Sequence, residues 1–452
     1  MIIITPDQMR EIEKIAETEF GLTSEILIER AANAIIQELE ADFGNQYGLR
    51  IFFAVGPGNN GKDALKVAEM LGMDPNKYSI EQAEVVIDGL YGTGLNRDIS
   101  TADSELIEAI NASGLPVYSI DIPSGINGLT GQIQGNAIKA CKTVSFFGAK
   151  PGLLFGPGKD CAGELVINDI DIPISKSISS HITLQSTHLD KKIFKRPQDS
   201  HKGTFGKVLV IAGSDGMRGA AAFCTNAAFA AGAGLVYVAT PSKVWDTVSV
   251  LAPAAIGIAK EDIYLMAGEV AAIIVGPGMG AGPVTREIVL KLLREFKTPL
   301  ILDADALNSI KAADITREVI ITPHLVEFER LAEVARGEIL NDRLGFVSDF
   351  SRKHSCVAIL KGAGTVVASS TGQLSINTNG NPGMAVAGSG DVLAGIIAGL
   401  AAQGLNLYEA ACGGVFLHGL AGDFAAKKHG ELSLLPSDIV KCISDACLSL
   451  KG

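Results

Sequence analysis

Short apolar runs, most of them ending in or followed by a glycine, proline or acidic residue, recur along this chain of 452 residues. The runs in the first half are IFFAV, VVID, PVYSIDI, TVSFF and ELVIND, and those in the second half are KVLVIAGS, LVYVAT, AAIIVGPG, PLILDADAL, VIITPH and CVAILKGAGTVVAS. Helical segments lie between them. This alternation is typical of parallel strands joined by helical crossovers. The sequence therefore predicts an α/β fold whose ligand sites lie at the carboxyl ends of the strands.

The segment 173–200, PISKSISSHITLQSTHLDKKIFKRPQDS, interrupts this alternation with serines, threonines and a basic cluster. Such a composition is typical of a linker or hinge. The chain is also too long for one ordinary core, because domains average roughly 150 residues. We therefore predict two domains, 1–190 and 191–452, with a boundary near 185–195.

The charge and the cysteines exclude several classes of protein. The net charge is −12, and no long lysine- or arginine-rich segment is present, so the usual footprint of a nucleic-acid-binding protein is missing. The seven cysteines form no CxxC pair, which favours reduced, mostly buried thiols over a disulfide framework or a zinc site. We expect small-molecule ligands, no nucleic-acid partner and a homo-oligomer.

Two uncharged stretches, 219–242 and 392–408, resemble membrane spans in their composition. The first contains Asn226 and a Gly-Ala-Gly break, so we interpret it as a buried helix followed by a buried strand. The second is short for a bilayer and contains three glycines, which favours a core helix. Because the start of the chain, MIIITPDQMR, lacks the basic flank and apolar core of a signal peptide, we expect a cytoplasmic protein without membrane association.

The segment AGSGD (387–391), which precedes the apolar run VLAGIIAGL, predicts a glycine loop at the start of a helix. Unpaired N–H groups at such a start form a cradle for anions. Asp391 would lie beside a bound phosphate, where it could accept the proton of a hydroxyl that attacks phosphorus. The alternative is that Asp391 only caps its helix. The loops LKGAGTVVAS (360–369), VGPGMG (275–280) and ITPH (321–324) should lie at the same edge of the sheet.

The second half resembles the ADP-dependent NAD(P)H-hydrate dehydratases, which have a ribokinase-like three-layer α/β/α fold. The resemblance rests on HKGTFGKVLVIAGS, GPGMG, LDADALN, TPH, KGAGT, GNPGMA and GSGD, in this order over residues 201–391. In that family a phosphoryl donor activates the hydroxyl at C6 of the hydrated nicotinamide ring, and expulsion of phosphate restores the dihydronicotinamide.

The resemblance implies a role for individual residues of the second half. Asp391 corresponds to the base that takes the C6 hydroxyl proton, and ADP and Mg²⁺ are the expected cofactors. Positions expected to bind the nucleotide are Lys361, Gly362, Ala363, Gly364, Thr365 and Gly390. Positions expected to bind the hydrate are Ala220, Gly278 and His324, although a histidine after a proline could also be a surface or capping residue. The chain has Val386 and Ala387 where the family usually has threonine and glycine.

The first half contains three further loops that follow apolar runs, in VGPGNNGKDALKVAEML (55–71), VVIDGLYGTGLNRDI (85–99) and SIDIPSGINGLTG (119–131). Together with TVSFFGAKPGLL (143–154), they resemble the Rossmann-like NAD(P)H-hydrate epimerase domain over nearly all of residues 1–172. This chain departs from the family in having NNGKDA for the usual NNGGDG. It also leaves no room before VVID for the strand and helix that the family usually has there.

By this resemblance Asp121 is the acid or base next to the substrate, and Asn60, Asp88 and Ser124 form a potassium site, since oxygen ligands suit a hard cation. The substrate-binding positions that the resemblance implies are Asn59, Asn60, Gly61, Lys62, Asp63, Gly92, Thr93, Gly94, Leu95, Asn96, Arg97 and Asp98.

We therefore predict a bifunctional nicotinamide-nucleotide repair enzyme that acts on NADHX and NADPHX. The first domain would interconvert the R and S hydrates, and the second would dehydrate the S form with ADP. One alternative is a ribokinase-like small-molecule kinase, which would use the same loop and the same aspartate. Another is that the first half is a noncatalytic binding or dimerisation module.

Overall fold

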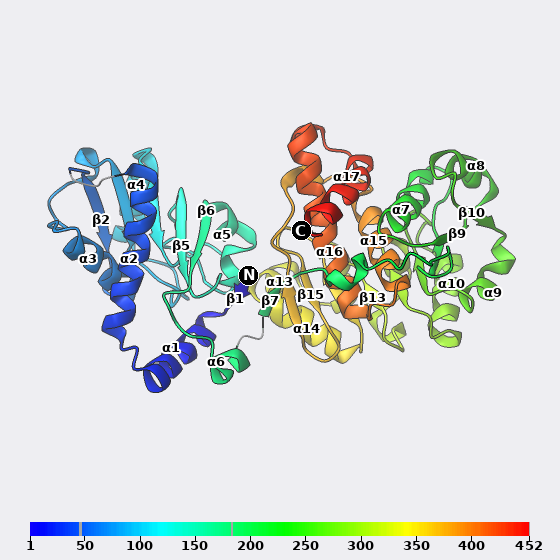
Figure 1. Cartoon of the computed structure of the whole chain (residues 1–452), viewed down its shortest axis with the longest axis horizontal. Helices are drawn as coiled ribbons and strands as arrows, with labels where there is room; N and C mark the ends of the chain where they lie inside the picture. The colour runs from blue at the N-terminus through cyan, green and yellow to red at the C-terminus, as the bar shows by residue number, and fades with distance from the viewer. Residues whose placement is uncertain (45–47, 182–183, 452) are drawn as a thin grey trace. The chain divides into compact units, whose positions relative to one another are not determined.

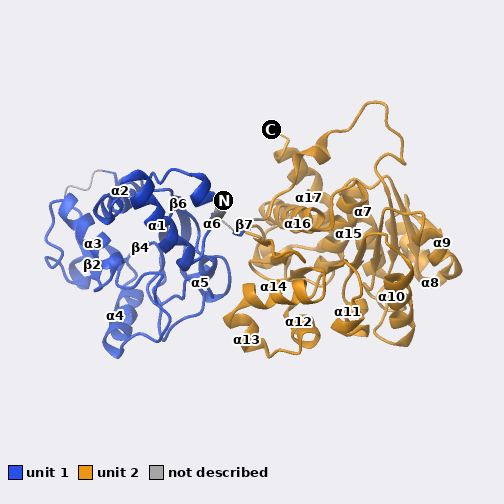
Figure 2. Ribbon diagram, turned by 90° about the horizontal axis from the view of Figure 1, so that it is seen from below, with its two compact units in different colours: residues 1–185 blue, residues 186–452 orange. Residues whose placement is uncertain are grey.

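The computed structural model describes residues 1–44, 48–181 and 184–451. The chain divides into two compact units, Met1–Gln185 and Ser186–Gly452, which Figure 2 shows in blue and orange. Each unit contains its own sheet and its own buried core.

Unit 1 is built mainly from a five-stranded sheet and the helices around it (Figure 1). Its elements are β1 (Ile2–Ile3), α1 (Pro6–Phe20), α2 (Ser24–Phe43), β2 (Ile51–Val55), α3 (Asn59–Met70), β3 (Val85–Gly89), α4 (Thr101–Ala112), β4 (Val117–Ile120), β5 (Lys142–Phe146), α5 (Gly156–Cys161), β6 (Glu164–Asn168), α6 (Lys176–His181) and β7 (Leu184–Ser186). The predicted runs IFFAV and VVID are β2 and β3. The segment predicted to be a linker contains α6, β7 and the 3-10 helix Lys191–Phe194.

The sheet of unit 1 has the order β2-β3-β4-β5-β6, and every pair in it is parallel. Successive side chains of a strand point to opposite faces. Ile51 and Phe53 of β2 therefore pack with α1, α2 and α3, whereas Ala54 packs with α4 on the other face.

The connections on either side of β3 have opposite handedness. The steps from β2 to β3 and from β3 to β4 cross the sheet in the same direction, yet α3 and α4 lie on opposite faces. One of the two crossovers is therefore left-handed, whereas nearly all such crossovers are right-handed. Residues 71–84 contain only the 3-10 helix Ile80–Gln82, which agrees with the missing strand and helix expected from the sequence. As a result, β2 forms the edge of this sheet.

Unit 2 has a longer sheet with the order β10-β9-β8-β11-β12-β13-β14-β15-β16, in which β8 to β14 are parallel and β15 and β16 are antiparallel. Its strands are β8 (Lys207–Ile211), β9 (Leu235–Ala239), β10 (Ile256–Ile258), β11 (Ala272–Val275), β12 (Leu300–Leu302), β13 (Ile320–Ile321), β14 (Val357–Leu360), β15 (Val366–Ala368) and β16 (Leu374–Ile376). Its helices are α7 (Arg218–Ala230), α8 (Ser242–Leu251), α9 (Ile263–Ala267), α10 (Pro283–Glu295), α11 (Asp305–Ser309), α12 (Leu325–Ala332), α13 (Arg336–Asn341), α14 (Arg343–Lys353), α15 (Ser389–Ala402), α16 (Leu407–His429) and α17 (Pro436–Ser449).

Helix α15 lies in the core of unit 2, and α7 packs closely against it. A Cβ atom on Gly395 would lie 2.4 Å from the carbonyl oxygen of Cys224, so only glycine permits this approach. The uncharged stretches 219–242 and 392–408 are thus a buried helix with a strand and a core helix, as predicted. Over the residues that the structure describes, we find no helix with the length and apolar character needed to cross a membrane.

Candidate active sites

The carboxyl ends of the parallel strands of unit 2 bring several predicted loops together. The loop after β14 begins with Lys361, which pairs in a parallel bridge with His324, the residue that follows β13 and Pro323. Gly276 follows β11, and a Cβ atom on it would lie 1.9 Å from the carbonyl oxygen of Asp303, which follows β12. Since these loops touch one another, they form one site at this edge of the sheet.

The centre of this site is an ion pair beside the start of α15. Lys361 Nζ lies 2.8 Å from Asp303 Oδ1, which also accepts a hydrogen bond of 2.6 Å from Thr322 Oγ1. Burial lowers the pKa of Lys361, but the charges of Asp303 and Glu327 outweigh it, so the net shift is upward. A Cβ atom on Gly390 would lie 3.4 Å from Lys361 Nζ, so this glycine keeps the backbone close to the ammonium group.

Asp391 lies in the first turn of α15 and does not cap the helix. The residue at the N-cap is Gly388, with φ of 96°, and no side-chain cap hydrogen bond is formed there. Burial raises the pKa of Asp391 to about 7, with a further contribution from the negative charge of Asp303 and an opposing one from Lys361. A carboxylate in this position can accept a proton near neutral pH.

The other predicted residues of unit 2 surround this centre. Gly278 has φ of 62°, and a Cβ atom on it would lie 2.9 Å from the Cβ of Ala220 at the start of α7. The turn 361–365 is held by Thr365, whose Oγ1 donates to the carbonyl oxygen of Gly362 at 2.8 Å. Gly362 and Gly364 have φ of 154° and 66°, and the carbonyl oxygen of Ala363 accepts a bond from Arg343.

His324 is the N-cap of α12. Its Nδ1 accepts hydrogen bonds from the backbone N–H groups of Val326 at 3.2 Å and Glu327 at 3.3 Å. The side chain is 53% exposed, so Nε2 can still contact a ligand. The structure thus supplies the capping role that the sequence had left as an alternative, and places it next to Lys361.

Sequence reasoning assigned no role to Asp303, Asp305 or His418 of this site. Asp303 and Asp305 occur in LDADAL, a motif that gave no preference between phosphate binding and capping. Ser389 Oγ lies 3.2 Å from Nε2 of His418, whose pKa burial lowers to about 4, so this imidazole is neutral at pH 7. His418 comes from the middle of α16, where no sequence pattern distinguishes it from a core residue.

Unit 1 contains a cavity of about 320 Å³ between α1, α2 and the carboxyl ends of its strands. Four predicted residues line it: Asn59, Lys62, Asp63 and Asp121. Asn60 and Gly61 are buried in α3. The loop 92–98 does not line the cavity, and its residues Gly94, Asn96, Arg97 and Asp98 are exposed. The lining also includes Glu13, which the sequence analysis had not assigned.

Asp121 is held by donors on one of its two oxygens. Its Oδ1 accepts hydrogen bonds from Ser145 Oγ at 3.1 Å and from the N–H of Phe146 at 3.0 Å, and it forms an ion pair with Lys150. The residue has φ of 64°, in the left-handed region that aspartate adopts more readily than most residues.

Asp63 has different surroundings in the same cavity. It is 7% exposed, and burial raises its pKa to about 8, with further contributions from the charges of Asp121 and Glu13. Burial also raises the pKa of Glu13. Asp121 thus accepts hydrogen bonds and an ion pair, whereas Asp63 in the same cavity is surrounded by other carboxyl groups.

Behind this cavity, the predicted potassium ligands lie close together. Asp88 is fully buried and accepts bonds from Ser124 Oγ at 2.5 Å and Ser119 Oγ at 2.7 Å. The side-chain amide of Asn60 contacts the carbonyl oxygens of Ile120 at 2.5 Å and Tyr91 at 3.4 Å. Burial raises the pKa of Asp88, and no charged side chain among the described residues offsets this effect.

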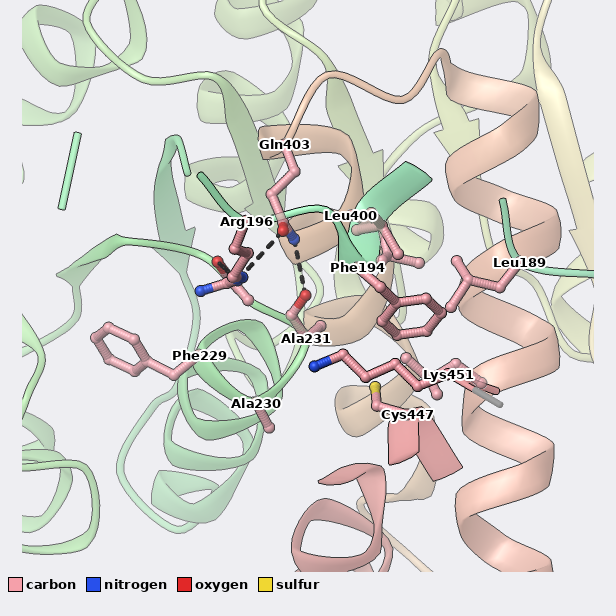
Figure 3. Close-up of a pocket in the computed structure, with 13 residues that line it drawn as sticks. Leu189, Phe194, Arg196, Phe229, Ala230, Ala231, Leu400, Gln403, Cys447 and Lys451 are labelled. Carbon is pink, nitrogen blue, oxygen red and sulfur yellow. Dashed lines mark hydrogen bonds between the residues drawn. The ribbon is translucent and has the colours of Figure 1, made fainter. Parts of the chain in front are cut away.

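A second cavity, of about 270 Å³, lies in unit 2 near the opposite ends of α7 and α15 (Figure 3). Gln403 Nε2 donates to the carbonyl oxygen of Ala231 at 2.7 Å, and Arg196 Nη2 donates to Gln403 Oε1 at 3.4 Å. Leu400, which also lines the cavity, follows Asp391 by nine residues, or about 14 Å along a helix. None of the predicted site residues lines this cavity.

Solved structures define the class of unit 2. A ribokinase-like superfamily protein from Enterococcus faecalis is 30% identical, covers 59% of this chain and 96% of its own, and superposes with a TM-score of 0.53. An ADP/ATP-dependent NAD(P)H-hydrate dehydratase from Bacillus subtilis, co-crystallised with ATP and Mg²⁺, is 29% identical, covers 56% of this chain and 93% of its own, and has a TM-score of 0.51. Unit 2 therefore has the ribokinase-like fold that the sequence predicted.

Whole-chain comparisons identify the family. Residues 208–445 match the family described as NAD(P)H-hydrate dehydratase, and residues 70–152 match the YjeF-related protein N-terminus. The bifunctional NAD(P)H-hydrate repair enzyme Nnr of Coxiella burnetii is 34% identical over 96% of both chains. The protein of the same name from Escherichia coli is 31% identical over 96% of this chain and 91% of its own. The chain belongs to the family of bifunctional NAD(P)H-hydrate repair enzymes.

Proposed function

We propose that unit 2 dehydrates the S form of NADHX and NADPHX with ADP, giving AMP and phosphate, and that unit 1 interconverts the R and S forms. The observation that carries the first proposal is the position of Asp391. It is a partly buried carboxyl group at the start of α15, with a pKa of about 7, in a segment that matches the dehydratase family.

In this mechanism Asp391 removes the proton from the hydroxyl at C6 as the oxygen attacks the terminal phosphorus of ADP. AMP leaves as the new bond from the C6 oxygen to phosphorus forms. The C6 oxygen then departs as phosphate, a far better leaving group than hydroxide, while the lone pair of the ring nitrogen forms an iminium double bond to C6. Loss of a proton from C5 to the released phosphate or to solvent then gives the C5=C6 double bond of the dihydronicotinamide. The backbone N–H groups of Gly390 and Asp391 at the start of α15, together with the turn 361–365, hold the phosphates. Ala220, Gly278 and His324 contact the hydrated ring.

A divalent cation fits the charges of unit 2. The carboxylates of Asp303 and Asp305 lie near enough to raise the pKa of Asp391, and only Lys361 opposes them. Carboxylates and phosphates are the ligands that Mg²⁺ prefers, so Asp303 or Asp305 would hold it, and the ion would neutralise phosphate charge. Co-crystallisation of the Bacillus subtilis dehydratase with ATP and Mg²⁺ supports the use of a nucleotide and a metal ion.

A potassium ion fits unit 1 because Asp88 is fully buried among neutral partners. A buried carboxylate without a cation is costly, so a bound cation would compensate for it. Asp88, Ser124 and Asn60 would hold the ion through their side-chain oxygens. The ion would fix the loop after β3 and the loop after β4, which carries Asp121.

The test of the unit 2 proposal is Asp391→Asn, assayed with purified (S)-NADHX, ADP and Mg²⁺. We expect at least about a 100-fold loss of dehydration, the usual effect of removing a general base, while nucleotide binding is retained. Turnover within a few-fold of the wild type would remove Asp391 from the mechanism. A phosphorylated hydrate that accumulates in the wild type without elimination would show a kinase instead.

A further inference from the structure

We infer that Asp121 and Asp63 form the acid–base pair of unit 1, with Asp121 as the base and Asp63 as the acid, and that the buried Lys150 positions Asp121. The inference rests on the epimerase function proposed for this unit. It assigns a role to Lys150, which sequence reasoning passed over, and changes the role of Asp63 from substrate binding to proton transfer.

Asp121 is held in place through one of its two carboxylate oxygens. Lys150 is completely buried, and its Nζ contacts Asp121 Oδ1, Ser145 Oγ at 3.2 Å and the carbonyl oxygen of Phe146 at 2.9 Å. An ammonium group and two neutral donors therefore converge on Oδ1. None of the hydrogen bonds among the described residues ends on Oδ2 of Asp121. This oxygen remains able to accept a proton from a ligand in the cavity.

The surroundings of Asp63 favour its neutral form. Its side chain makes no hydrogen bond with any residue that the structure describes, and it lines the same cavity as Asp121 and Glu13. A desolvated carboxyl group beside two other carboxyl groups keeps its proton, and the raised pKa of Asp63 agrees with this. The cavity thus presents one proton acceptor and one proton donor.

The chemistry of the hydrate requires such a pair. C6 carries a hydroxyl group and the ring nitrogen, so it is a hemiaminal carbon. Asp121 takes the hydroxyl proton, the C6=O bond forms as the bond from C6 to nitrogen breaks, and the nitrogen takes the proton of Asp63. The aldehyde then rotates about the bond between C5 and C6, and the nitrogen adds to its other face.

Ring closure restores both carboxyl groups. The nitrogen returns its proton to the carboxylate of Asp63, and the new C6 oxygen takes the proton held by Asp121. No oxidant, reductant or further reactant is consumed, and the only net change is inversion at C6. Arg10, Lys14 and Lys62 also line the cavity and can bind the phosphates of the dinucleotide.

The experiment follows the interconversion of purified (R)- and (S)-NADHX by the full-length protein without ADP, so that dehydration cannot occur. For Asp63→Asn we expect the enzymatic rate to fall at least about 100-fold with little change in KM, since only proton donation is lost. Asp63→Glu should recover part of the rate. Glu69→Gln, a carboxyl-to-amide change at an exposed position on the same helix, is the matched control and should match the wild type.

Lys150→Met tests the positioning role. We expect it to lower kcat of epimerisation at least about tenfold with little change in KM, and we expect Lys150→Arg, which keeps the cation, to recover part of the rate. A structural role alone would not produce this split between kcat and KM. ADP-dependent dehydration of (S)-NADHX serves as the folding control for the whole chain. If the wild type interconverts the epimers and Asp63→Asn keeps a rate within threefold, the acid–base assignment is overturned. If the wild type itself does not exceed the uncatalysed rate, the epimerase function fails instead.

Discussion

The two sites place a lysine against different carboxyl groups. In unit 2, Lys361 pairs with Asp303 at 2.8 Å, and the proposed base Asp391 forms no ion pair with any residue that the structure describes. In unit 1, Lys150 pairs with Asp121 itself, and Asp63 forms no ion pair within the described part of the chain. The pKa values of Asp391 and Asp63 rise to about 7 and about 8 for the same leading reason, burial.

The lysine of each site thus lies against one carboxyl group, and burial raises the pKa of the other. With a pKa of about 7, Asp391 is divided between its two forms at neutral pH, and its anion can act as a base. With a pKa of about 8, Asp63 is mostly protonated and can act as an acid. The difference between the sites predicts opposite pH dependences for the two reactions.

The largest expected effect is on the pH profiles of kcat/KM. Dehydration needs the anion of Asp391, so its rate should fall about tenfold per pH unit below about 7. Epimerisation needs the proton of Asp63, so its rate should fall above about pH 8. Measuring both reactions separately between about pH 5 and 9 checks this. If the rates of both reactions fell on the acidic side, or both on the alkaline side, the roles assigned to Asp391 and Asp63 would be contradicted.

A smaller effect is expected for potassium. Asp88 lies in unit 1, and we expect Asp88→Asn to remove the dependence of epimerisation on K⁺ and to lower its rate about tenfold, or about 1.4 kcal/mol. Dehydration of (S)-NADHX should be unchanged, because its site is built from unit 2. The measurement is a titration of both activities with K⁺ against Na⁺. Epimerisation without any response to K⁺ in the wild type would argue against the ion.

The smallest effect is on stability, for Asp63→Asn. The pKa of Asp63 is 3.8 in a model peptide and about 8 in the folded state, so between these values the folded state binds more protons. The free energy of unfolding therefore decreases as pH rises through this range. Asparagine carries no charge, so the variant should be more stable than the wild type at pH 8 and should unfold at a higher Tm.

Thermal unfolding of wild type and variant at both ends of this pH range provides the check. The gain should disappear near pH 4, where the wild-type carboxyl group is protonated in both states. A variant that is less stable than the wild type at pH 8 would show that Asp63 makes a stabilising interaction as an anion.

Local patterns predicted most strands and the loops that carry Asp121, Asp391 and Lys361, because strand ends in a parallel sheet meet at one edge. They did not identify Lys150 or Glu13. Lys150 follows β5 in a segment that resembles an ordinary turn, and it is recognised only when its ammonium group is seen buried against Asp121. Glu13 lies on an amphipathic helix where an acidic residue is common. The roles of Lys150 and Glu13 depend on contacts between segments that are distant in the sequence, and residue spacing does not predict such contacts.

The shortened part of unit 1 illustrates a different limit. The sequence indicated that a strand and a helix are missing before β3, but not how the chain would cross the sheet without them. The structure keeps α3 on the face of α1 and α2, where Asn59, Lys62 and Asp63 line the cavity. The loop 92–98 was predicted to bind substrate, yet it does not line that cavity.

The central claim is that each unit carries out its own reaction on the same metabolite. The most direct test gives the protein a mixture of (R)- and (S)-NADHX with ADP, Mg²⁺ and K⁺, and follows the return of dihydronicotinamide absorbance. We predict that the wild type recovers both epimers at one rapid rate and that Asp121→Asn slows sharply once the S form is consumed. A wild type that stops at the S fraction would contradict the role of unit 1, and no recovery at all would contradict the whole account.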